Sequence, residues 1–282
     1  MFKAPVKWEL VATSNCGFKN ENQDNYLMIY DDGLAEYMED EAIVKEMTKD
    51  WKMGCVRLVV ADGVGGHKNG RAASEALITA LKHLPFQSEA ETLRANLLKL
   101  HNNLHKKFGK GEKTPGSTLV IADIDSEGNA TIGSIGDSRA YRLKVNKSIA
   151  LTRDQTIAEY AWRDKEINVE EYEKSRQATT NVLAQAMIFG SSGIIPDKKG
   201  RKLIRHNAFI RLDYRDVFKV KLELGEGLLL ASDGLWAHTE NNQFQMPLAD
   251  IKSLPTAIKK QHEQAIWKGS TDNITSVIAR MT

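Results

Sequence analysis

The stretch RLVVADGVGGHKNG, residues 57–70, combines a short apolar run, a carboxylate and a group of glycines. Residues 58–61 have the length and composition of a buried β-strand, which places Asp62 at the strand's end. The glycines after Asp62 allow the backbone to turn sharply or to approach another group closely. Carboxylates and backbone carbonyls are the ligands that Mg²⁺ and Mn²⁺ prefer, so the stretch is well suited to a divalent metal site.

The flanking sequence predicts strands on both sides of this stretch and two helices directly after it. Apolar residues recur at helical spacing over roughly residues 70–84 and 88–108. Three closely spaced strands follow without an intervening helix, which indicates antiparallel hairpins. These patterns predict an α+β protein in which stacked antiparallel sheets are covered by helices. The predicted strands are residues 8–14, 25–30, 117–124, 130–135, 140–145, 217–224, 227–231 and 274–281, and a further helix is predicted near 254–267.

Two segments interrupt this pattern. An acidic insertion near residues 31–53 has helical spacing at Leu34, Met38, Ile43 and Met47, so we expect a surface helix or a flexible excursion there. Residues 165–207 are the least regular region and end in a basic run. The six prolines are spread along the chain and mark no linker, so we expect one domain over residues 1–282.

Composition narrows the classes of function. The 282 residues carry a formal net charge of +2, which argues against a nucleic-acid binder that acts through bulk charge. No apolar run has the roughly 20 residues of a membrane span. The N-terminal residues lack the apolar centre of a signal peptide. Cys16 and Cys55 form no metal-binding or redox motif, so we expect reduced, buried thiols and a cytoplasmic location.

Five aspartates share one local context, the end of a predicted strand beside glycine or asparagine. Three of them repeat the same arrangement, in VVADG, SIGDS and LLLASDG. One such aspartate is commonly a turn or helix cap. Five in one chain indicate metal ligands, because carboxylates gathered at sheet edges repel one another unless a cation lies among them. Two bridged cations are the arrangement that hydrolyses phosphate esters. The five are Asp24, Asp62, Asp137, Asp233 and Asp272.

These motifs, in this order, resemble those of the metal-dependent serine/threonine protein phosphatases of type 2C, and the bacterial branch in particular. The resemblance runs from about residue 13 to the C-terminus. It implies a four-layer αββα sandwich, with two antiparallel sheets in the centre, helices outside and a binuclear metal centre at one edge. The motifs are NQDNY, VADGVGGH, GSTLVIADI, GDSRAYRL, LTRDQT, LLASDGLW and DNITSVIAR.

The resemblance also implies a role for each site residue. Asp62 would bridge two Mn²⁺ or Mg²⁺ ions, and Gly63 would contribute its carbonyl oxygen. Two further aspartates, Asp233 and Asp272, would complete the first metal site. Asp24 would act at the second site through water. The remaining aspartate, Asp137, would help to hold a weak third ion.

The chain departs from the family pattern at four positions. Lys19 stands at the position of the phosphate-binding arginine, so it keeps the charge but loses the bidentate fork. Val64 replaces a histidine that is a candidate general acid in some members, so another group must protonate the leaving alcohol. Ala237 replaces an aspartate, which weakens the third site. The common Asp-His pair is Asp154-Gln155 here. All residues expected at the binuclear pair are present.

The resemblance implies hydrolysis of phosphoserine and phosphothreonine on proteins by a metal-bridging hydroxide, without a covalent enzyme intermediate. The partners would be phosphorylated proteins, in opposition to a serine/threonine kinase. Residues 165–207 coincide with the family's mobile flap, which would shape substrate access. Two alternatives stay open at this point. One is a catalytically impaired scaffold with the same fold, and the other is a small-molecule phosphatase.

Other motif-like features support weaker hypotheses. Asp123 and Asp125 match the DxD of haloacid-type phosphatases, but a hairpin turn follows them. Residues 123–134 resemble a calcium-binding loop, yet Ser134 stands where the bidentate glutamate is needed. The glycines at 63–66 lack the third glycine of a dinucleotide-binding loop. His67 is expected to be a hydrogen-bonded loop residue. The basic run at 198–206 is expected to be a solvated loop, with docking of an acidic partner as the alternative.

Overall fold

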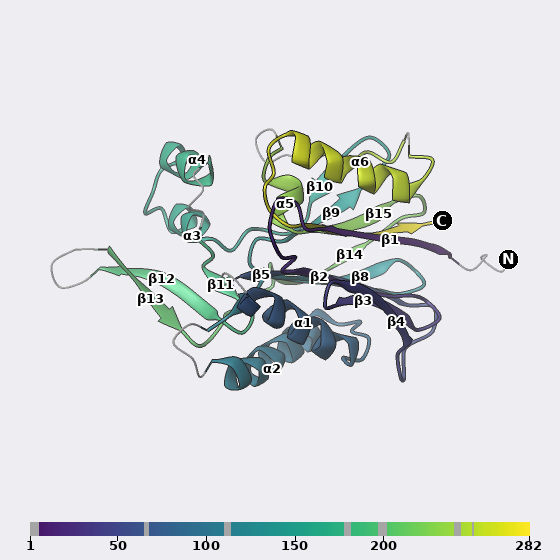
Figure 1. The fold of residues 1–282 in the computed structure, drawn as a ribbon, viewed down its shortest axis with the longest axis horizontal. Coiled ribbons are helices and arrows are strands. Elements are labelled where there is room, and N and C mark those ends of the chain that lie inside the picture. Colours follow the sequence, from purple (N-terminus) through teal and green to yellow (C-terminus); the bar gives the residue numbers. More distant parts are fainter. Residues whose placement is uncertain are drawn as a thin grey trace.

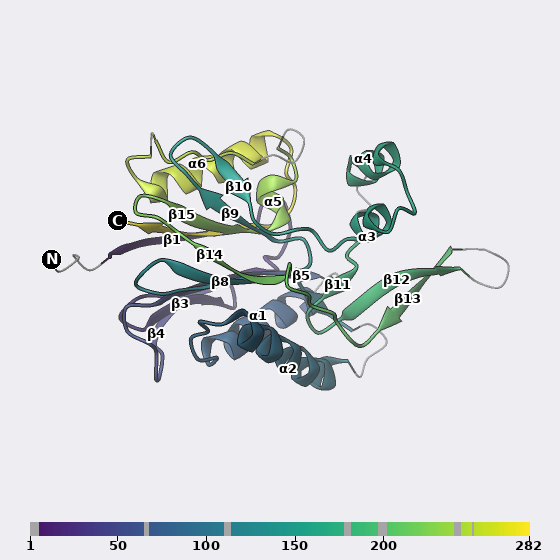
Figure 2. The same cartoon turned by 180° about the vertical axis from the view of Figure 1, so that it is seen from behind.

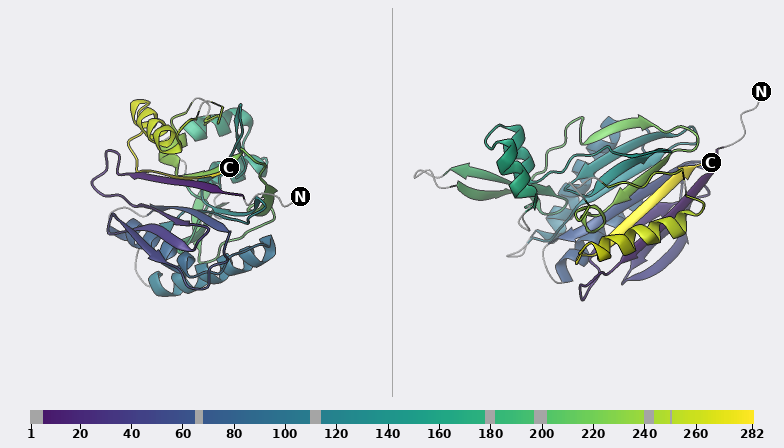
Figure 3. Two further views of the ribbon diagram at one scale, coloured as in Figure 1. Left: turned by 90° about the vertical axis from the view of Figure 1, so that its right-hand side faces the viewer. Right: turned by 90° about the horizontal axis from the view of Figure 1, so that it is seen from above.

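The computed structural model describes residues 6–64, 68–109, 114–177, 182–196, 202–239, 244–249 and 251–282, with backbone only at 68, 176–177, 193–196 and 202–206. Two antiparallel sheets stack face to face and helices cover both outer faces (Figure 1). This confirms the expected α+β, four-layer αββα sandwich. An end-on view shows the layers in the order helix, sheet, sheet, helices (Figure 3).

The larger sheet has the order β14-β8-β7-β5-β2-β3-β4, with the short β6 paired to β5, and the smaller has the order β1-β16-β15-β9-β10. The strands are β1 (Trp8–Asn15), β2 (Asp24–Ile29), β3 (Leu34–Glu39), β4 (Ala42–Met47), β5 (Val56–Val64), β6 (Gly116–Ser117), β7 (Leu119–Ile124), β8 (Asn129–Ile135), β9 (Arg139–Leu143), β10 (Ser148–Ala150), β14 (Val217–Lys221), β15 (Gly227–Ala231) and β16 (Ile274–Met281). The helices are α1 (Lys68–Lys82), α2 (Ala90–Phe108), α3 (Ile157–Arg163), α4 (Val169–Gln177), α5 (Asp233–Trp236) and α6 (Leu254–Trp267).

The central strands are buried on both faces, which explains their nearly continuous apolar sequence. Successive side chains of a strand point to opposite faces. In β5, Leu58 and Val60 therefore pack against the other sheet, whereas Val59 and Ala61 pack beneath α1 and α2. The α2 side chains spaced by four residues, such as Leu93 and Leu97, form the inner stripe of that helix.

The acidic insertion is a β-hairpin, so the prediction of a helix was wrong. The hairpin consists of β3 and β4, and it extends the larger sheet because β3 pairs with β2. Its turn residues Asp40 and Glu41 have φ angles of 48° and 62°, as in the two-residue turns that match strand twist. A spacing of four residues also keeps side chains on one face of a strand. The four apolar residues had suggested one face of a helix. In the structure they form two cross-strand pairs of the hairpin, Leu34 with Met47 and Met38 with Ile43.

The region 165–207 is more regular than expected. It contains α4 and a small antiparallel sheet of β11 (Gln185–Ala186), β12 (Gly190–Pro196) and β13 (Lys202–Asn207). Figure 2 shows that β12 and β13 project from the sandwich, with α3 and α4 on one side of them. The base of this projection joins the larger sheet through a bridge between Ser117 and Met187. We call residues 165–207 the flap segment below.

Other features agree with the sequence except in one detail. Both cysteines are free thiols. Cys55 is buried as expected, whereas Cys16 is only half-buried in a loop.

Asp125 caps the β7–β8 turn, accepting hydrogen bonds from the backbone N–H groups of Glu127 and Asn129. This agrees with a hairpin turn. No helix within the described ranges is long and apolar enough to cross a bilayer.

Arg57 joins the larger sheet to its helix layer through a fully buried network. Its guanidinium donates two hydrogen bonds of 2.6 Å to Asp123 on the neighbouring strand β7. The remaining donors reach the carbonyl oxygens of Leu81, in the last turn of α1, and of Leu84 and Pro85, just after the helix. All five N–H donors of the arginine are thus satisfied, as a buried guanidinium requires.

Two histidines of α2 hold a strained residue at the base of the flap segment. Ile188 is buried and has a φ of 70°, which is a rare backbone conformation for a β-branched residue. Its N–H donates to His101 Nδ1 at 3.1 Å, and its carbonyl oxygen lies 2.6 Å from His105 Nδ1. Because His101 Nδ1 accepts, its proton is on Nε2, which lies 2.7 Å from the Ala208 carbonyl oxygen.

We predict that Arg57→Met lowers the free energy of unfolding by about 3–5 kcal/mol, because it leaves the Asp123 carboxylate buried without its partner. Urea denaturation of purified protein measures this change. Arg94 on α2 contacts Glu91 at the surface and provides the control. Arg94→Met should change stability by no more than about 0.5 kcal/mol. Equal losses for both variants would show that the buried network is dispensable.

The His101 contacts predict a pH-dependent stability. Burial lowers the pKa of His101, the hydrogen bond to Ala208 opposes this, and nearby His105 lowers the pKa further. A folded-state pKa below the unfolded value means that the stabilisation is present above about pH 6.5 and decreases as the pH falls. Between pH 7 and pH 5 the wild type should lose more unfolding free energy than His101→Gln, as measured by urea denaturation in chelator. Identical losses would contradict a neutral His101.

Candidate functional site

The five predicted aspartates lie at one edge of the sandwich. In the larger sheet, Asp24 begins β2 and is paired in register with Asp62 near the end of β5. Asp24 is buried, and it accepts a 2.7 Å hydrogen bond from Ser232 Oγ. Ser232 directly follows β15 of the other sheet, so this bond connects the two sheets at the edge.

The smaller sheet brings three aspartates to the same edge. Strand β15 runs antiparallel to both of its neighbours, with Ala231 paired to Arg139 of β9 and to Ser276 of β16. The end of β15 is therefore beside the starts of β9 and β16. The three aspartates occupy these positions, Asp233 after β15, Asp137 before β9 and Asp272 before β16.

Gly63 is required by a close approach of backbone segments. A Cβ atom at Gly63 would lie 2.3 Å from the Gly70 carbonyl oxygen and 2.7 Å from that of Gln23. The Gly63 N–H donates to the same Gln23 oxygen at 3.2 Å. The sequence prediction of a close contact is correct for this glycine, whereas Gly65, Gly66 and His67 lie outside the described residues.

The carboxylates at this edge influence one another's protonation. Burial and the neighbouring Asp24 and Asp233 raise the pKa of Asp62 well above its usual value. Burial, followed by Asp233 and Asp154, does the same for Asp137. Burial raises the pKa of Asp24 to about 7 and that of Asp233 to about 6. A cation at this edge would favour the ionised carboxylates and release protons as it binds.

Lys19 lies beside this group of carboxylates. Its Nζ is 3.4 Å from Asp272 Oδ1, and both side chains are about half exposed. Asn273 holds the surrounding loops together. It accepts from the Gln23 N–H at 2.9 Å and donates to the carbonyl oxygens of Cys16 and Glu21. These bonds fix the loop that carries Asp272.

The structure adds a pair of residues to which sequence analysis assigned no role at the site. Arg139 forms two hydrogen bonds with Asp154, of 2.8 and 2.6 Å. Its guanidinium also stacks on Trp236 at 3.3 Å from the ring centroid. This residue thus ties together the loops that carry Asp137, Asp154 and Asp233. The motifs GDSR, LTRD and DGLW contain all of these residues, but only tertiary contact shows that they meet.

The donor chemistry of the edge fits a divalent cation. Several carboxylates and the carbonyl group of Gly63 are hard oxygen donors, and their mutual repulsion is relieved by positive charge. In the described part of the chain, however, no three aspartate, glutamate, histidine or cysteine side chains form a group that could hold an ion. The donors fit Mg²⁺ or Mn²⁺ by type and charge, while their present spacing forms no coordination cage.

Comparison with known proteins places this chain in a family. The sequence model described as protein phosphatase 2C matches residues 44–263, which is most of the chain. The matched range contains Asp62, Asp137 and Asp233, whereas Asp24 and Asp272 lie outside it.

Individual relatives and solved structures agree with this match. The chain is 28% identical over 231 residues to the serine/threonine phosphatase stp of Listeria welshimeri, covering 78% of this chain and 82% of that protein. It is 27% identical over 245 residues to the protein phosphatase PhpP of Streptococcus pneumoniae, covering 82% and 87%. The fold is similar to that of serine/threonine phosphatase Stp1 from Staphylococcus aureus, with a TM-score of 0.71, 22% identity, and coverage of 100% of this chain and 98% of that one. The chain therefore belongs to the protein phosphatase 2C family of serine/threonine protein phosphatases.

Proposed function

We propose that this phosphatase hydrolyses phosphoserine and phosphothreonine on proteins at the carboxylate edge, with two Mn²⁺ or Mg²⁺ ions bound there. The observation that supports the proposal most is the convergence of Asp24 and Asp62 from one sheet with Asp137, Asp233 and Asp272 from the other. Such a group of carboxylates costs free energy to bury and gains stability when cations bind.

Individual residues would have distinct roles. Asp62 would be the ligand shared by both ions, assisted by the carbonyl of Gly63. Asp233 and Asp272 would serve one ion, Asp24 the other through water, and Asp137 a weaker third ion. When bound, the cations would supply Lewis-acid stabilisation of charge on the phosphoryl oxygens and lower the pKa of water.

The rest of the edge would orient these ligands. The Ser232 hydroxyl holds one oxygen of Asp24, and the Thr118 Oγ1 accepts from the Asp62 N–H at 3.0 Å. Lys19 would bind the phosphate of the substrate as a point charge. It is half exposed and beside Asp272, so its ammonium can reach a phosphate placed over the edge.

Phosphoproteins are the proposed substrates because the curated relatives carry the names serine/threonine phosphatase and protein phosphatase. A serine/threonine kinase would supply those substrates. The flap segment would shape their access, because its base is bridged to Ser117, and Ser117 also pairs with Gly63 at the carboxylate edge.

We predict that Asp62→Asn or Asp233→Asn reduces kcat/KM by about 100-fold or more while the thermal unfolding midpoint stays near that of the wild type. Each change removes a charged oxygen donor worth several kcal/mol in the transition state. Turnover of p-nitrophenyl phosphate with added Mn²⁺ measures the effect. Asp31→Asn, at an exposed turn, is the control and should be fully active.

Metal removal tests the same proposal independently. EDTA should abolish turnover of the wild type, because it would remove the cations that the carboxylates hold near the reacting phosphate. Excess Mn²⁺ should restore turnover by refilling the site. Full activity of the wild type in excess chelator would refute metal-assisted hydrolysis at this edge.

Substitution of Lys19 should separate binding from chemistry. Lys19→Ala is expected to raise KM for a phosphothreonine peptide about tenfold with a smaller change in kcat, because a charged hydrogen bond to phosphate is lost. Lys19→Arg should keep or improve KM, since the guanidinium restores bidentate binding. Lys147→Ala, at an exposed position, is the matched control. Steady-state kinetics that are unchanged in Lys19→Ala would mean that Lys19 does not contact the phosphate.

A further inference from the structure

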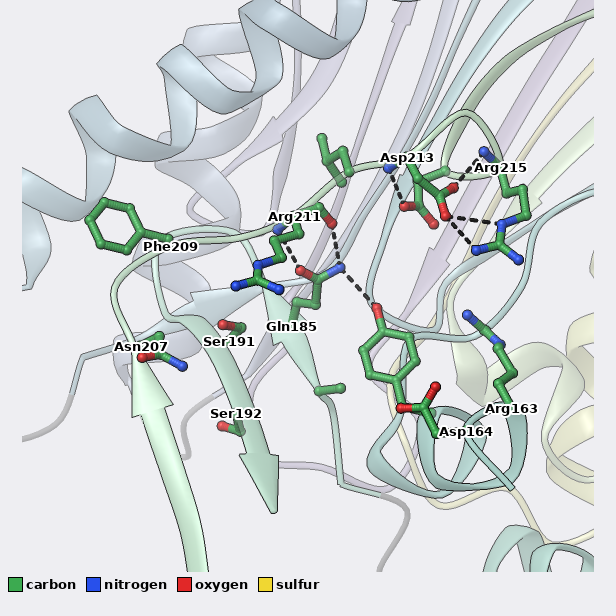
Figure 4. A pocket seen from close by; sticks show the side chains of 14 residues that line it. Arg163, Asp164, Gln185, Ser191, Ser192, Asn207, Phe209, Arg211, Asp213 and Arg215 are labelled. Atoms are coloured by element: carbon green, nitrogen blue, oxygen red, sulfur yellow. Dashed lines mark hydrogen bonds and ion pairs between the residues drawn. The ribbon is translucent and has the colours of Figure 1, made fainter. Parts of the chain in front are cut away.

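A cavity of about 750 Å³ lies where the flap segment meets α3 and residues 207–216. Figure 4 shows the side chains that line it, and Arg211 and Asp164 lie on opposite walls. The wall from the flap segment includes Gln185 and Ser191, and the wall from α3 includes Tyr160. We call this cavity the Arg211 pocket.

The backbone of Arg211 is held in place by a buried glutamine. Gln185 Oε1 accepts from the Arg211 N–H at 2.8 Å, and Gln185 Nε2 donates to the Arg211 carbonyl oxygen at 2.9 Å. The same amide nitrogen donates to the Tyr160 hydroxyl at 3.0 Å. These bonds fix the main chain from which the Arg211 side chain extends, so its guanidinium is presented from a rigid position.

Most other charges of the Arg211 pocket are neutralised within the protein. Arg215 pairs with Asp213 at 2.6 Å. Asp216 accepts from Gln155 Nε2 at 2.9 Å and lies 3.9 Å from Arg153. Arg163 pairs with Glu159 at 2.8 Å.

Arg211 is different from these residues. Among the described residues no carboxylate pairs with its guanidinium, which in Figure 4 points toward Ser191 and Asn207. An arginine beside a hydroxyl and an amide can bind a carboxylate or a phosphate group. Phe209, which is 70% exposed on the same wall, adds an apolar surface of the kind found at peptide-binding sites.

The Arg211 pocket is connected to the carboxylate edge by two hydrogen bonds in series. Asp216 in the pocket wall accepts from Gln155, whose Oε1 accepts from the N–H of Gly136 at 2.9 Å. Gly136 directly precedes Asp137 of the carboxylate edge. Arg163, also in the pocket wall, donates to the Asp154 carbonyl at 3.0 Å. These bonds hold the pocket wall next to the loop that carries Asp137, which makes the pocket a neighbouring site for substrate residues that flank the phosphorylated one.

We propose that the Arg211 pocket binds an anionic side chain of the phosphoprotein substrate, at a position flanking the phosphorylated residue, and so gives the enzyme a preference for acidic sequences. This inference rests on the proposed function of the carboxylate edge. The carboxylate of Asp164 lies on the opposite wall and forms no ion pair within the described part of the chain. It disfavours an anion at that end, so the acidic side chain is directed toward Arg211.

The test uses phosphothreonine peptides in which one aspartate is moved through each flanking position of an otherwise neutral sequence. For the wild type, kcat/KM should rise about fivefold at one or two positions, and the rise should shrink with added salt. Arg211→Gln should remove this preference, and Arg211→Glu should reverse it in favour of lysine. A peptide with a non-hydrolysable phosphonate in place of the aspartate distinguishes a second phosphate from a carboxylate as the preferred group.

Controls keep the inference separate from the proposed function. Turnover of p-nitrophenyl phosphate should be unchanged in both Arg211 variants, and Arg94→Gln on α2 should keep the aspartate preference. Fluorescence anisotropy of labelled peptides in chelator measures the same preference without turnover. The inference is wrong if aspartate has no effect at any position, or if Arg211→Gln retains the preference. Loss of all wild-type turnover with a preserved binding preference would refute only the proposed function.

Discussion

The pairing of β2 with β5 places two carboxylates opposite each other at a sheet edge, and much of the site depends on this constraint. Asp24 and Asp62 are directly opposed in the register, and the aspartates of the other sheet lie at the end of β15 and just before the starts of β9 and β16. Burying such charges without compensation is unfavourable. The hydroxyl of Ser232, the ammonium of Lys19 and the paired Arg139 supply part of the compensation. Divalent cations are the remaining source of positive charge that this chemistry favours.

Buried arginines support the edge from behind. Arg57 connects β5 to β7 and to the end of α1, so the strand that carries Asp62 is fixed to its helix layer. Arg139 acts on the other sheet, where it joins Asp154 to the ring of Trp236 in the short helix α5. Both guanidinium groups make bidentate contacts with a carboxylate, which a lysine could not reproduce. The positions of the site carboxylates thus depend on buried arginines behind the edge.

The flap segment is joined to the sandwich at a strained position. Ile188 adopts a left-handed backbone conformation, and α2 histidines contact both its N–H and its carbonyl oxygen. The adjoining Met187 pairs with Ser117, the residue of β6 that pairs with Gly63 of β5. The base of the flap segment is therefore coupled to the carboxylate edge through the backbone. The Arg211 pocket lies against this base, where loops from three parts of the chain meet.

Sequence by itself determined the layers and the chemistry of the site. The apolar runs marked the central strands, the helical spacing marked α1 and α2, and the strand-end aspartates identified donors that the register then brought to one edge. These features could be predicted because they depend on local periodicity and on motifs. The β3–β4 hairpin could not, since a spacing of four suits a helix and one face of a strand equally well. Tertiary structure alone decided the partners of Arg57 and Arg139 and the clamp of Gln185 on Arg211, because each joins segments far apart in the chain. Long-range hydrogen bonds follow from how the layers pack, and no local pattern encodes them.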